Sequence, residues 1–287
     1  MKKKIILFLI TILFLLNIFT WHEVFVLAEN SNLKVDFLNI GQGDSVFIET
    51  PQLHQIIIDG GPGSVVLEKL QKLMPFHDRT IDMVILTHPD KDHIEGLLRV
   101  LQRYKVDYIL WTGIVRDGAI YQKWLSLLKK SEKQGTKIIK AKFGQEIKAG
   151  NVVIYTLHPF EDLTDKDFGN KGNDTGIVSH LIFGKNTFLF TADISSDLEK
   201  ELVGKGINLK SDVLKVAHHG SKYSTSDEFL KNVIPKIAVI SVGKNSYGHP
   251  TPETLQRLEN FGIYVLRTDK DGDIKIISDG NNLKVLK

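Results

Sequence analysis

The stretch Ile85-Leu86-Thr87-His88-Pro89-Asp90-Lys91-Asp92-His93 carries the strongest signal in the sequence. It begins as an apolar run typical of a buried strand, and four potential metal ligands then follow within six residues. In an extended loop, residues two apart point the same way, so His88 and Asp90 can share one ion. Asp92 and His93 lie where the chain turns into a helix and can face a second ion. The alternative is an exposed polar turn with Asp92 capping the helix, but such a turn does not require two histidines.

The residue types limit the kind of ion. The chain contains no cysteine, so a thiolate zinc site and a cysteine nucleophile are both excluded. Neutral imidazoles and carboxylates suit borderline or harder divalent ions such as Zn²⁺ or Mn²⁺. We therefore expect a divalent metal held by histidine and aspartate.

The first thirty residues differ from the rest of the chain. Three lysines precede an almost unbroken apolar run from Ile5 to Phe19, and Ala28 supplies a small residue at a cleavage point. This pattern predicts a secretory signal peptide at residues 1–28. The alternative is a retained membrane anchor, for which an apolar run of about 15 residues is short. In either case the body of the protein lies outside the cytoplasm, secreted or anchored to the outer face of the membrane.

Bulk charge does not favour a nucleic-acid partner. The formal charge of the whole chain is +3, and without residues 1–28 it falls to about +1. Any basic surface on the mature protein must therefore be local.

From Leu33 onward, short β-rich runs alternate with amphipathic helices, without a linker or repeat. We therefore expect one domain over residues 29–287. Two β-rich halves, each with helices, predict two sheets packed face to face with helices outside, an α+β sandwich. In layered α/β folds, sites are built at strand ends. Polar residues follow apolar β-forming runs at five such places: Asp59, His88, Asp193, His218 and His249.

Two further segments can complete the site. Asp193 alone would be a helix N-cap or turn residue, but beside the first cluster it can bridge two metals about 3.5–4 Å apart. A strand expected at Val213–Ala217 runs into His218 and His219. Adjacent histidines at a strand end point in different directions, so we expect only one of them to bind metal. Ser221 can bind phosphate through its hydroxyl or cap the next helix.

Three weaker candidates remain. Pro250 accounts for the turn at Tyr247-Gly248-His249-Pro250, but the turn does not explain why a histidine stands at position 249. It is interpreted as a general acid or oxyanion donor, with a surface histidine as the alternative. Asn173 precedes a strand and either completes a site or forms an Asx turn, and Asp59 is expected to form a turn before two glycines.

Together these residues resemble the metallo-β-lactamase superfamily. Its usual signature is HxHxDH, and this chain has His88-x-Asp90-x-Asp92-His93, with Asp90 in place of the second histidine. That variant is similar to the hydrolase domain of ComEC-type DNA-uptake proteins, and the resemblance covers about Leu33 to Ser278. Other segments fit the same subgroup: Asn39-Ile40-Gly41-Gln42-Gly43-Asp44-Ser45, Ile58-Asp59-Gly60-Gly61, Thr191-Ala192-Asp193, Val213-Leu214-Lys215-Val216-Ala217-His218-His219-Gly220-Ser221 and Tyr247-Gly248-His249-Pro250.

The resemblance implies a four-layer αββα sandwich with two divalent metal ions, Zn²⁺ or Mn²⁺, at one edge of the sheets. His88 and Asp90 would bind the first ion. Asp92 and His93 would bind the second, with Asp193 bridging the two.

One of the adjacent histidines would complete the second site, and we prefer His218, the first residue after the expected strand. The family's third-motif histidine falls at Asn173. With Asp90 and Asn173 the first site has two imidazoles fewer. This favours manganese over zinc and leaves a single-ion site as the alternative.

The activity that the resemblance implies is an exported phosphodiesterase or nuclease acting on DNA or another nucleic acid. A metal-bound water, its pKa lowered toward neutrality, would attack phosphorus. Asp92 would orient that water, and His249 would help to stabilise the transition state. Lys215, Lys222 or Ser221 would hold the phosphate.

Two other functions stay open. One is hydrolysis of another ester, such as a cell-envelope or small phosphodiester; Asp90 and Asn173 make a lactam the least expected substrate. The other is a non-catalytic binding module with a decayed metal site, suggested by the near-neutral charge and the missing imidazoles. The sequence indicates no protein partner, and the N-terminal segment would associate with a membrane if it is retained.

Overall fold

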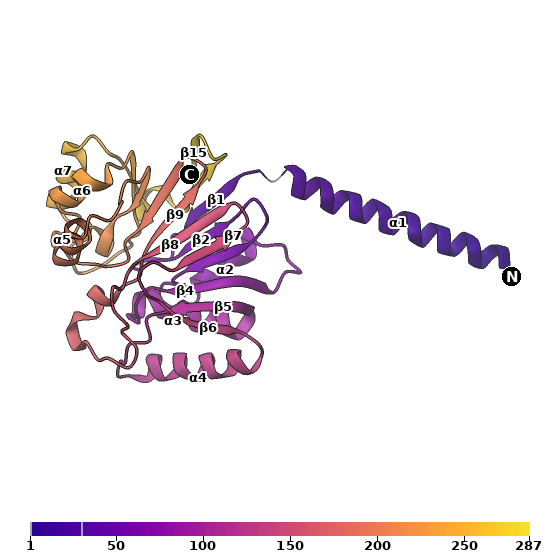
Figure 1. Cartoon of the computed structure of the whole chain (residues 1–287), viewed down its shortest axis with the longest axis horizontal. Helices are drawn as coiled ribbons and strands as arrows, with labels where there is room; N and C mark the ends of the chain where they lie inside the picture. Colours follow the sequence, from indigo (N-terminus) through magenta and orange to yellow (C-terminus); the bar gives the residue numbers. More distant parts are fainter. Residues whose placement is uncertain (1, 30) are drawn as a thin grey trace.

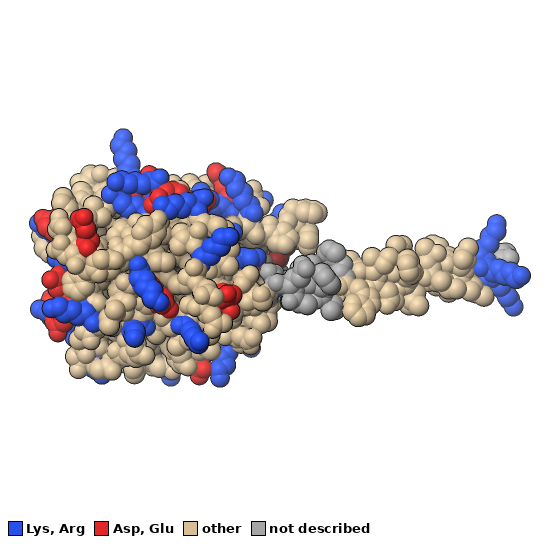
Figure 2. Space-filling model, turned by 90° about the horizontal axis from the view of Figure 1, so that it is seen from above, with Lys and Arg blue, Asp and Glu red and all other residues tan. Residues whose placement is uncertain are grey.

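The structure, a computed structural model, describes residues 2–29 and 31–287 and begins with an apolar helix, α1 (Lys2–Glu29). The stretch Lys2–Trp21 has a mean hydropathy of 2.2, and none of it is buried in the protein. By length and composition this helix can cross a membrane, although a signal sequence has the same properties. It stands clear of the sheets (Figure 1), with basic side chains at its far end (Figure 2).

The first sheet has eight strands in the order β15-β14-β1-β2-β3-β4-β5-β6. Its strands are antiparallel from β15 to β3 and parallel from β3 to β6. They span Leu33–Phe37 (β1), Val46–Glu49 (β2), Gln55–Ile58 (β3), Thr80–Leu86 (β4), Lys105–Trp111 (β5), Lys137–Lys140 (β6), Ile274–Ser278 (β14) and Leu283–Leu286 (β15).

The second sheet has seven strands in the order β13-β12-β11-β10-β9-β8-β7. The pairs from β10 to β13 are parallel, and those from β10 to β7 are antiparallel. They span Glu146–Ala149 (β7), Val152–His158 (β8), Val178–Phe183 (β9), Asn186–Phe190 (β10), Val213–Lys215 (β11), Ile237–Ile240 (β12) and Tyr264–Arg267 (β13).

Helices cover the outer faces of both sheets (Figure 1). One apolar core joins the first sheet to α2, α3 and α4, and another joins the second sheet to α5, α6 and α7. The helices are α2 (Val65–Leu73), α3 (Lys91–Arg103), α4 (Ala119–Lys133), α5 (Ser196–Gly204), α6 (Asp227–Val233), α7 (Pro252–Asn260) and α8 (Thr268–Asp271), with short 3₁₀ helices η1 (Gly169–Thr175) and η2 (Ala217–Gly220).

A third core lies between the sheets and explains the near-continuous apolar strands. In β2, Val46 and Ile48 face this inner core, whereas Phe47 faces the core under the helices. Because successive side chains of a strand point to opposite faces, a strand buried on both sides needs apolar residues at every position. The predicted αββα sandwich is therefore confirmed.

The parallel strands bring the chemically important residues to one edge. Asp59 follows β3 directly, and His88 follows β4 by two residues. In the second sheet, Asp193 follows β10 and His219 follows β11, again after short turns. Because parallel strands end at the same edge, side chains distant in the sequence meet there.

Close backbone contact fixes α3 against this edge. The amide of Gly96, inside α3, donates to the carbonyl of Gly61 over 2.8 Å, and that of Gly60 donates to the carbonyl of His93 over 2.8 Å. A Cβ at Gly96 would lie 1.9 Å from the carbonyl oxygen of Gly60. The glycine lets α3 approach closely enough to place His93.

We expect Gly96→Ala to lower the free energy of unfolding by about 1–3 kcal/mol, because the new methyl group forces two backbone segments apart. Gly204→Ala is the matched control, since a Cβ at this exposed helical glycine meets nothing within 4 Å. It should leave stability unchanged or raise it by about 0.5 kcal/mol. Urea unfolding of the full chain in detergent measures both. Equal effects at the two glycines would contradict the packing argument.

Candidate metal centre

His88 is a neutral imidazole with one nitrogen held in place. Its Nδ1 lies 3.0 Å from Thr87 Oγ1, which donates to Asp59 Oδ2 over 2.6 Å. Burial lowers the pKa of His88 to about 3, so the ring is uncharged at neutral pH. Its buried Nε2 has no hydrogen-bond partner. This nitrogen keeps its lone pair and is available to a metal.

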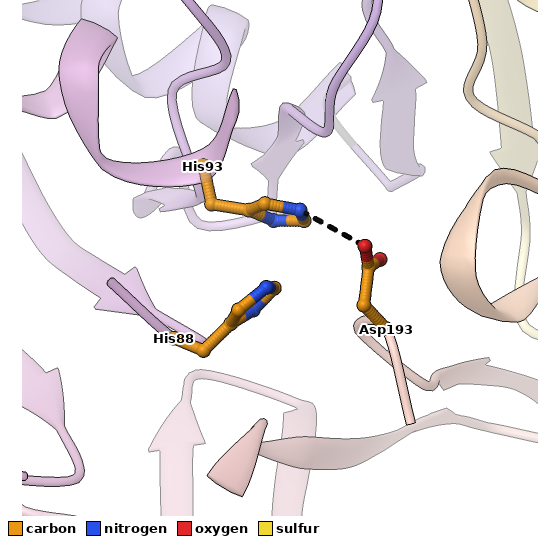
Figure 3. Close-up of side chains that lie close together, drawn as sticks. All are labelled: His88, His93 and Asp193. Carbon is orange, nitrogen blue, oxygen red and sulfur yellow. Dashed lines mark ion pairs between the residues drawn. The ribbon is translucent and has the colours of Figure 1, made fainter. Parts of the chain in front are cut away.

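His93 reaches the same place from the first turn of α3. Its Nδ1 donates to Asp59 Oδ2 over 2.8 Å, while its Nε2 lies 3.4 Å from Asp193 Oδ2. Figure 3 shows the rings of His88 and His93 and the carboxylate of Asp193 directed toward one another. A carboxylate that holds the far nitrogen of a histidine is the usual outer partner of a metal-bound imidazole.

His219 completes the arrangement from the second sheet. Its Nδ1 donates to the carbonyl of Ser241 over 2.8 Å. Its Nε2 lies 3.3 Å from Asp92 Oδ2 and 3.3 Å from Asp193 Oδ2. Each of the three histidines is thus held through Nδ1, with Nε2 turned inward.

The charges around these rings fit a bound cation. Burial alone would lower the pKa of His93 and of His219, but adjacent carboxylates, Asp193 foremost, raise both well above the usual value. Burial would raise the pKa of Asp193, yet His219 and His93 hold it well below its usual range. The carboxylates therefore stabilise a proton on His93 and on His219. A divalent ion would compete with these protons for the imidazole nitrogens.

Among the described residues, potential ligand atoms lie within 4.8 Å of one another in overlapping sets. One set is His88, His93 and Asp193; another is Asp92, His93 and His219. We call these five residues the metal centre. Imidazole nitrogens and carboxylate oxygens are ligands for Zn²⁺ and Mn²⁺ alike, so the residues fit a divalent metal.

The structure moves the interpretation of the histidine pair from His218 to His219. His218 belongs to none of the close sets. It lies 3.4 Å from the side-chain nitrogen of Asn173, and its ring centroid is 5.4 Å from that of His249. Strand β11 ends at Lys215, two residues before the end expected from the sequence. His218 is therefore not the first residue after the strand, and the turn directs His219 inward.

Left-handed backbone shapes the loops that carry the site. Four residues in these loops have positive φ values: 57° at Asp59, 49° at Ala192, 49° at His218 and 54° at His219. For residues other than glycine this conformation costs of order 1 kcal/mol or more, and it persists where the surroundings impose it. The amide of His218 donates to the carbonyl of Ala192 over 3.2 Å, so the loops after β10 and β11 stabilise each other.

Lys215 and Ser221 are buried, although phosphate-binding residues are expected to be accessible to substrate. Both are 2% exposed. Lys215 Nζ contacts the carboxylate of Asp44, lies 3.6 Å from Asp193 Oδ1 and donates to the carbonyl of Ala192 over 3.0 Å. Burial would lower the pKa of Lys215, but Asp44 and Asp193 raise it. This burial does not favour direct contact of Lys215 or Ser221 with substrate, and their role in holding phosphate stays a prediction.

Lys222, in contrast, is exposed, and its Nζ lies 5.2 Å from the centre of the Tyr223 ring. Its proposed contact with phosphate stays a prediction.

Asp90 has partners on two sides. Its Oδ2 lies 3.9 Å from His88 Nε2, and its Oδ1 pairs with the guanidinium of Arg116. Arg116 also donates to the carbonyl of Gly169 over 2.6 Å, at the start of η1, which contains Asn173. Arg116 thus links Asp90 to the start of the 3₁₀ helix that carries Asn173.

The comparison with known families decides the identity of the fold. The family described as the metallo-beta-lactamase superfamily matches residues 38–244. The chain belongs to this superfamily.

Within the metallo-beta-lactamase superfamily, the chain is similar to competence proteins. It is 33% identical to "ComE operon protein 3" of Bacillus subtilis, over 92% of the chain and 34% of that protein. It is 30% identical to "Competence protein ComA" of Neisseria gonorrhoeae, over 82% of the chain and 31% of that protein. The resemblance to ComEC-type proteins is confirmed, and the chain spans about a third of these relatives' length.

A solved metallo-beta-lactamase fold protein, YhfI of Bacillus subtilis, superimposes with a TM-score of 0.58 at 17% identity. The match covers 85% of this chain and 99% of that protein. At this identity the likeness concerns the fold.

Sequence reasoning missed the roles of Asp44 and Arg116 in this metallo-beta-lactamase centre. Asp44 lies in the glycine-rich loop after β1, and its amide donates to the carbonyl of Asp92 over 3.1 Å. At Gly43 a Cβ would lie 2.2 Å from that same carbonyl oxygen. The loop Gly41-Gln42-Gly43-Asp44 was the available signal for Asp44, whereas no motif surrounds Arg116.

Proposed function

We propose that this protein is an exported metal-dependent phosphodiesterase that hydrolyses nucleic acid. The observation that carries the proposal is the set of three imidazoles, each held through Nδ1, whose Nε2 atoms converge with Asp193. The similarity to "Competence protein ComA" and the resemblance to ComEC-type DNA-uptake proteins support nucleic acid as the substrate class. Helix α1 supports export, with the domain secreted or anchored at the outer face of a membrane.

The chain's own residues have distinct tasks in this proposal. His88, His93, His219 and Asp193 would hold the metal, which when bound acts as a Lewis acid and activates water as a nucleophile. Asp92 is partly exposed, with 33% of its side chain accessible. Burial would raise the pKa of Asp92, but the hydrogen bond from His219 lowers it. The ionised carboxylate can orient the attacking water.

His249 lies next to His218, with their ring centroids 5.4 Å apart. Its Nδ1 is buried without a hydrogen-bond partner. Burial, then the neighbouring His218, lowers the pKa of His249, so the ring is neutral and can donate one hydrogen bond to a phosphoryl oxygen. Asn173, beside His218, would contact substrate or the outer side of the first metal position.

The test uses the full chain purified in detergent, with labelled single-stranded and double-stranded DNA and added Mn²⁺ or Zn²⁺. We expect cleavage that stops when EDTA removes the metal. No metal-dependent cleavage of either DNA would refute the nuclease proposal. Cleavage of small chromogenic phosphodiesters alone would point instead to another ester.

A pair of variants tests the ligand assignment independently of the substrate. We expect His219→Ala to lose metal, because its Nε2 lies between Asp92 and Asp193, whereas His218→Ala should retain it. Elemental analysis after dialysis measures the metal content of each. Retention by the His219 variant and loss by the His218 variant would restore the assignment made from the sequence.

A further inference from the structure

A cavity of about 420 Å³ opens beside the metal centre. The two halves of the sandwich both contribute to its wall: the start of α3, the loop before α4 and the loop after β12. Asp92 of the metal centre lines it together with Lys91, Arg116 and Tyr247. A molecule in this cavity would therefore lie against the centre.

Tyr247 presents an aromatic face at this cavity. The residue is 73% exposed, and its ring centroid lies 5.8 Å from that of His249, with the two planes 32° apart. The ring of His249 lies in turn 5.4 Å from that of His218. The ring of His218 lies 6.2 Å from that of His219 in the metal centre, so neighbouring rings connect Tyr247 to the centre.

The loop that carries Tyr247 is held by hydrogen bonds. Asn245 Oδ1 accepts from the amides of Tyr247 and His249 over 3.0 and 3.1 Å. Asn245 Nδ2 donates to the carbonyls of Gly243 and His249 over 2.9 and 2.8 Å. The ring is thus presented by a fixed loop, and binding on it costs little ordering of the backbone.

Cationic groups lie in the same wall. Lys91 is exposed, and Arg116 is partly exposed, with 26% of its side chain accessible. Three carboxylates also line the cavity: Asp90 is paired with Arg116, Asp92 belongs to the metal centre, and Asp117 is exposed. The cavity thus carries two cationic side chains beside an aromatic ring, and of these Arg116 is paired with Asp90.

We propose that this cavity is a nucleotide subsite for single-stranded nucleic acid, in which one base stacks on Tyr247 and its phosphate lies toward Lys91 and Arg116. The inference rests on the proposed function and adds the form of the substrate. In a duplex, neighbouring bases cover both faces of each base, whereas an unpaired base can stack on an aromatic side chain. Stacking tolerates any sequence, because every base has a π-face.

Binding of labelled 12-nucleotide single-stranded DNA to the full chain in detergent tests the subsite. A strand of equal length with abasic positions keeps the phosphates without the bases. Fluorescence anisotropy is measured in Ca²⁺, and gels confirm that the strands stay intact. We expect Tyr247→Ala to weaken binding of the intact strand by roughly 5- to 100-fold and to leave binding of the abasic strand and metal content unchanged. Tyr247→Phe should bind as wild type, because it keeps the ring.

Two controls separate stacking from charge and from general damage. Tyr264→Ala removes a 52% exposed tyrosine at the start of β13, the end of the sheet away from the centre, and should change nothing. Lys91→Ala should weaken both strands equally and reduce the salt dependence of binding by about one phosphate contact.

Wild-type affinity of Tyr247→Ala for the intact strand would overturn the subsite while leaving the proposed function standing. Equal loss with both strands, or loss in Tyr247→Phe, would also overturn it. If the wild-type protein binds neither strand, the subsite and the proposed nucleic-acid substrate both fail.

Discussion

Asp193→Asn is expected to abolish metal binding at the centre and to reduce the proposed phosphodiesterase activity about a thousandfold. In the wild-type protein, Asp193 Oδ2 lies 3.4 Å from His93 Nε2 and 3.3 Å from His219 Nε2. One carboxylate oxygen therefore lies beside ligands from both halves of the sandwich. Asparagine keeps the shape but removes the negative charge. A metal contributes several kcal/mol of transition-state stabilisation, and about 4 kcal/mol corresponds to this factor.

Elemental analysis and single-turnover cleavage measure the two effects of Asp193→Asn separately. Asp107→Asn is the control, because Asp107 lies near the start of β5, far from the strand ends that build the site, and pairs with Lys105 at 3.2 Å. That variant should keep its metal and its activity. Full metal content in Asp193→Asn would refute its assignment as a ligand.

Lys215→Met is expected to lower the free energy of unfolding of the metal-free protein by about 3–5 kcal/mol, because it leaves buried carboxylates without their counter-charge. Lys215 and Asp44 are both almost fully buried and in contact, and Asp193 lies beside them. Added Mn²⁺ supplies positive charge at the same place and should stabilise the variant more than the wild type.

Urea unfolding with EDTA and with Mn²⁺ gives both quantities for the Lys215 variant. Lys236→Met is a matched control, since Lys236 pairs with Asp212 at 2.8 Å but has 77% of its side chain exposed. A pair whose lysine is this exposed contributes less than about 1 kcal/mol. If the two lysine variants lose the same small amount, the buried cation has no structural importance.

Much of the fold and the location of the site could be predicted from the residue pattern of the strands. Apolar runs that end in Asp59, His88 or Asp193 place polar groups at strand ends, and parallel pairing then brings them together. The choice between His218 and His219 could not be predicted, because it depends on where β11 ends and on a left-handed turn. A sequence pattern does not specify that turn.

The chemical roles of cations were the least predictable part. A lysine near two histidines, such as Lys215, suggests a surface group that binds phosphate. The structure places β11 between β10 and β12, and the Lys215 side chain is buried there beside Asp44 and Asp193. The sequence also gives little sign of strand β15 (Leu283–Leu286), because a short edge strand with only two partly buried residues gives a weak pattern.

The metal centre joins parts of the chain that are far apart in sequence. A metal shared by His93 and Asp193 would close a loop of roughly 100 residues, and a cross-link of that span can remove about 5 kcal/mol of chain entropy from the unfolded state. The protein has no cysteine and so no disulfide. The ion would instead act as the cross-link between the two sheets. Removal of the ion by a chelator would therefore lower the free energy of unfolding of the sandwich as well as abolish the proposed hydrolysis.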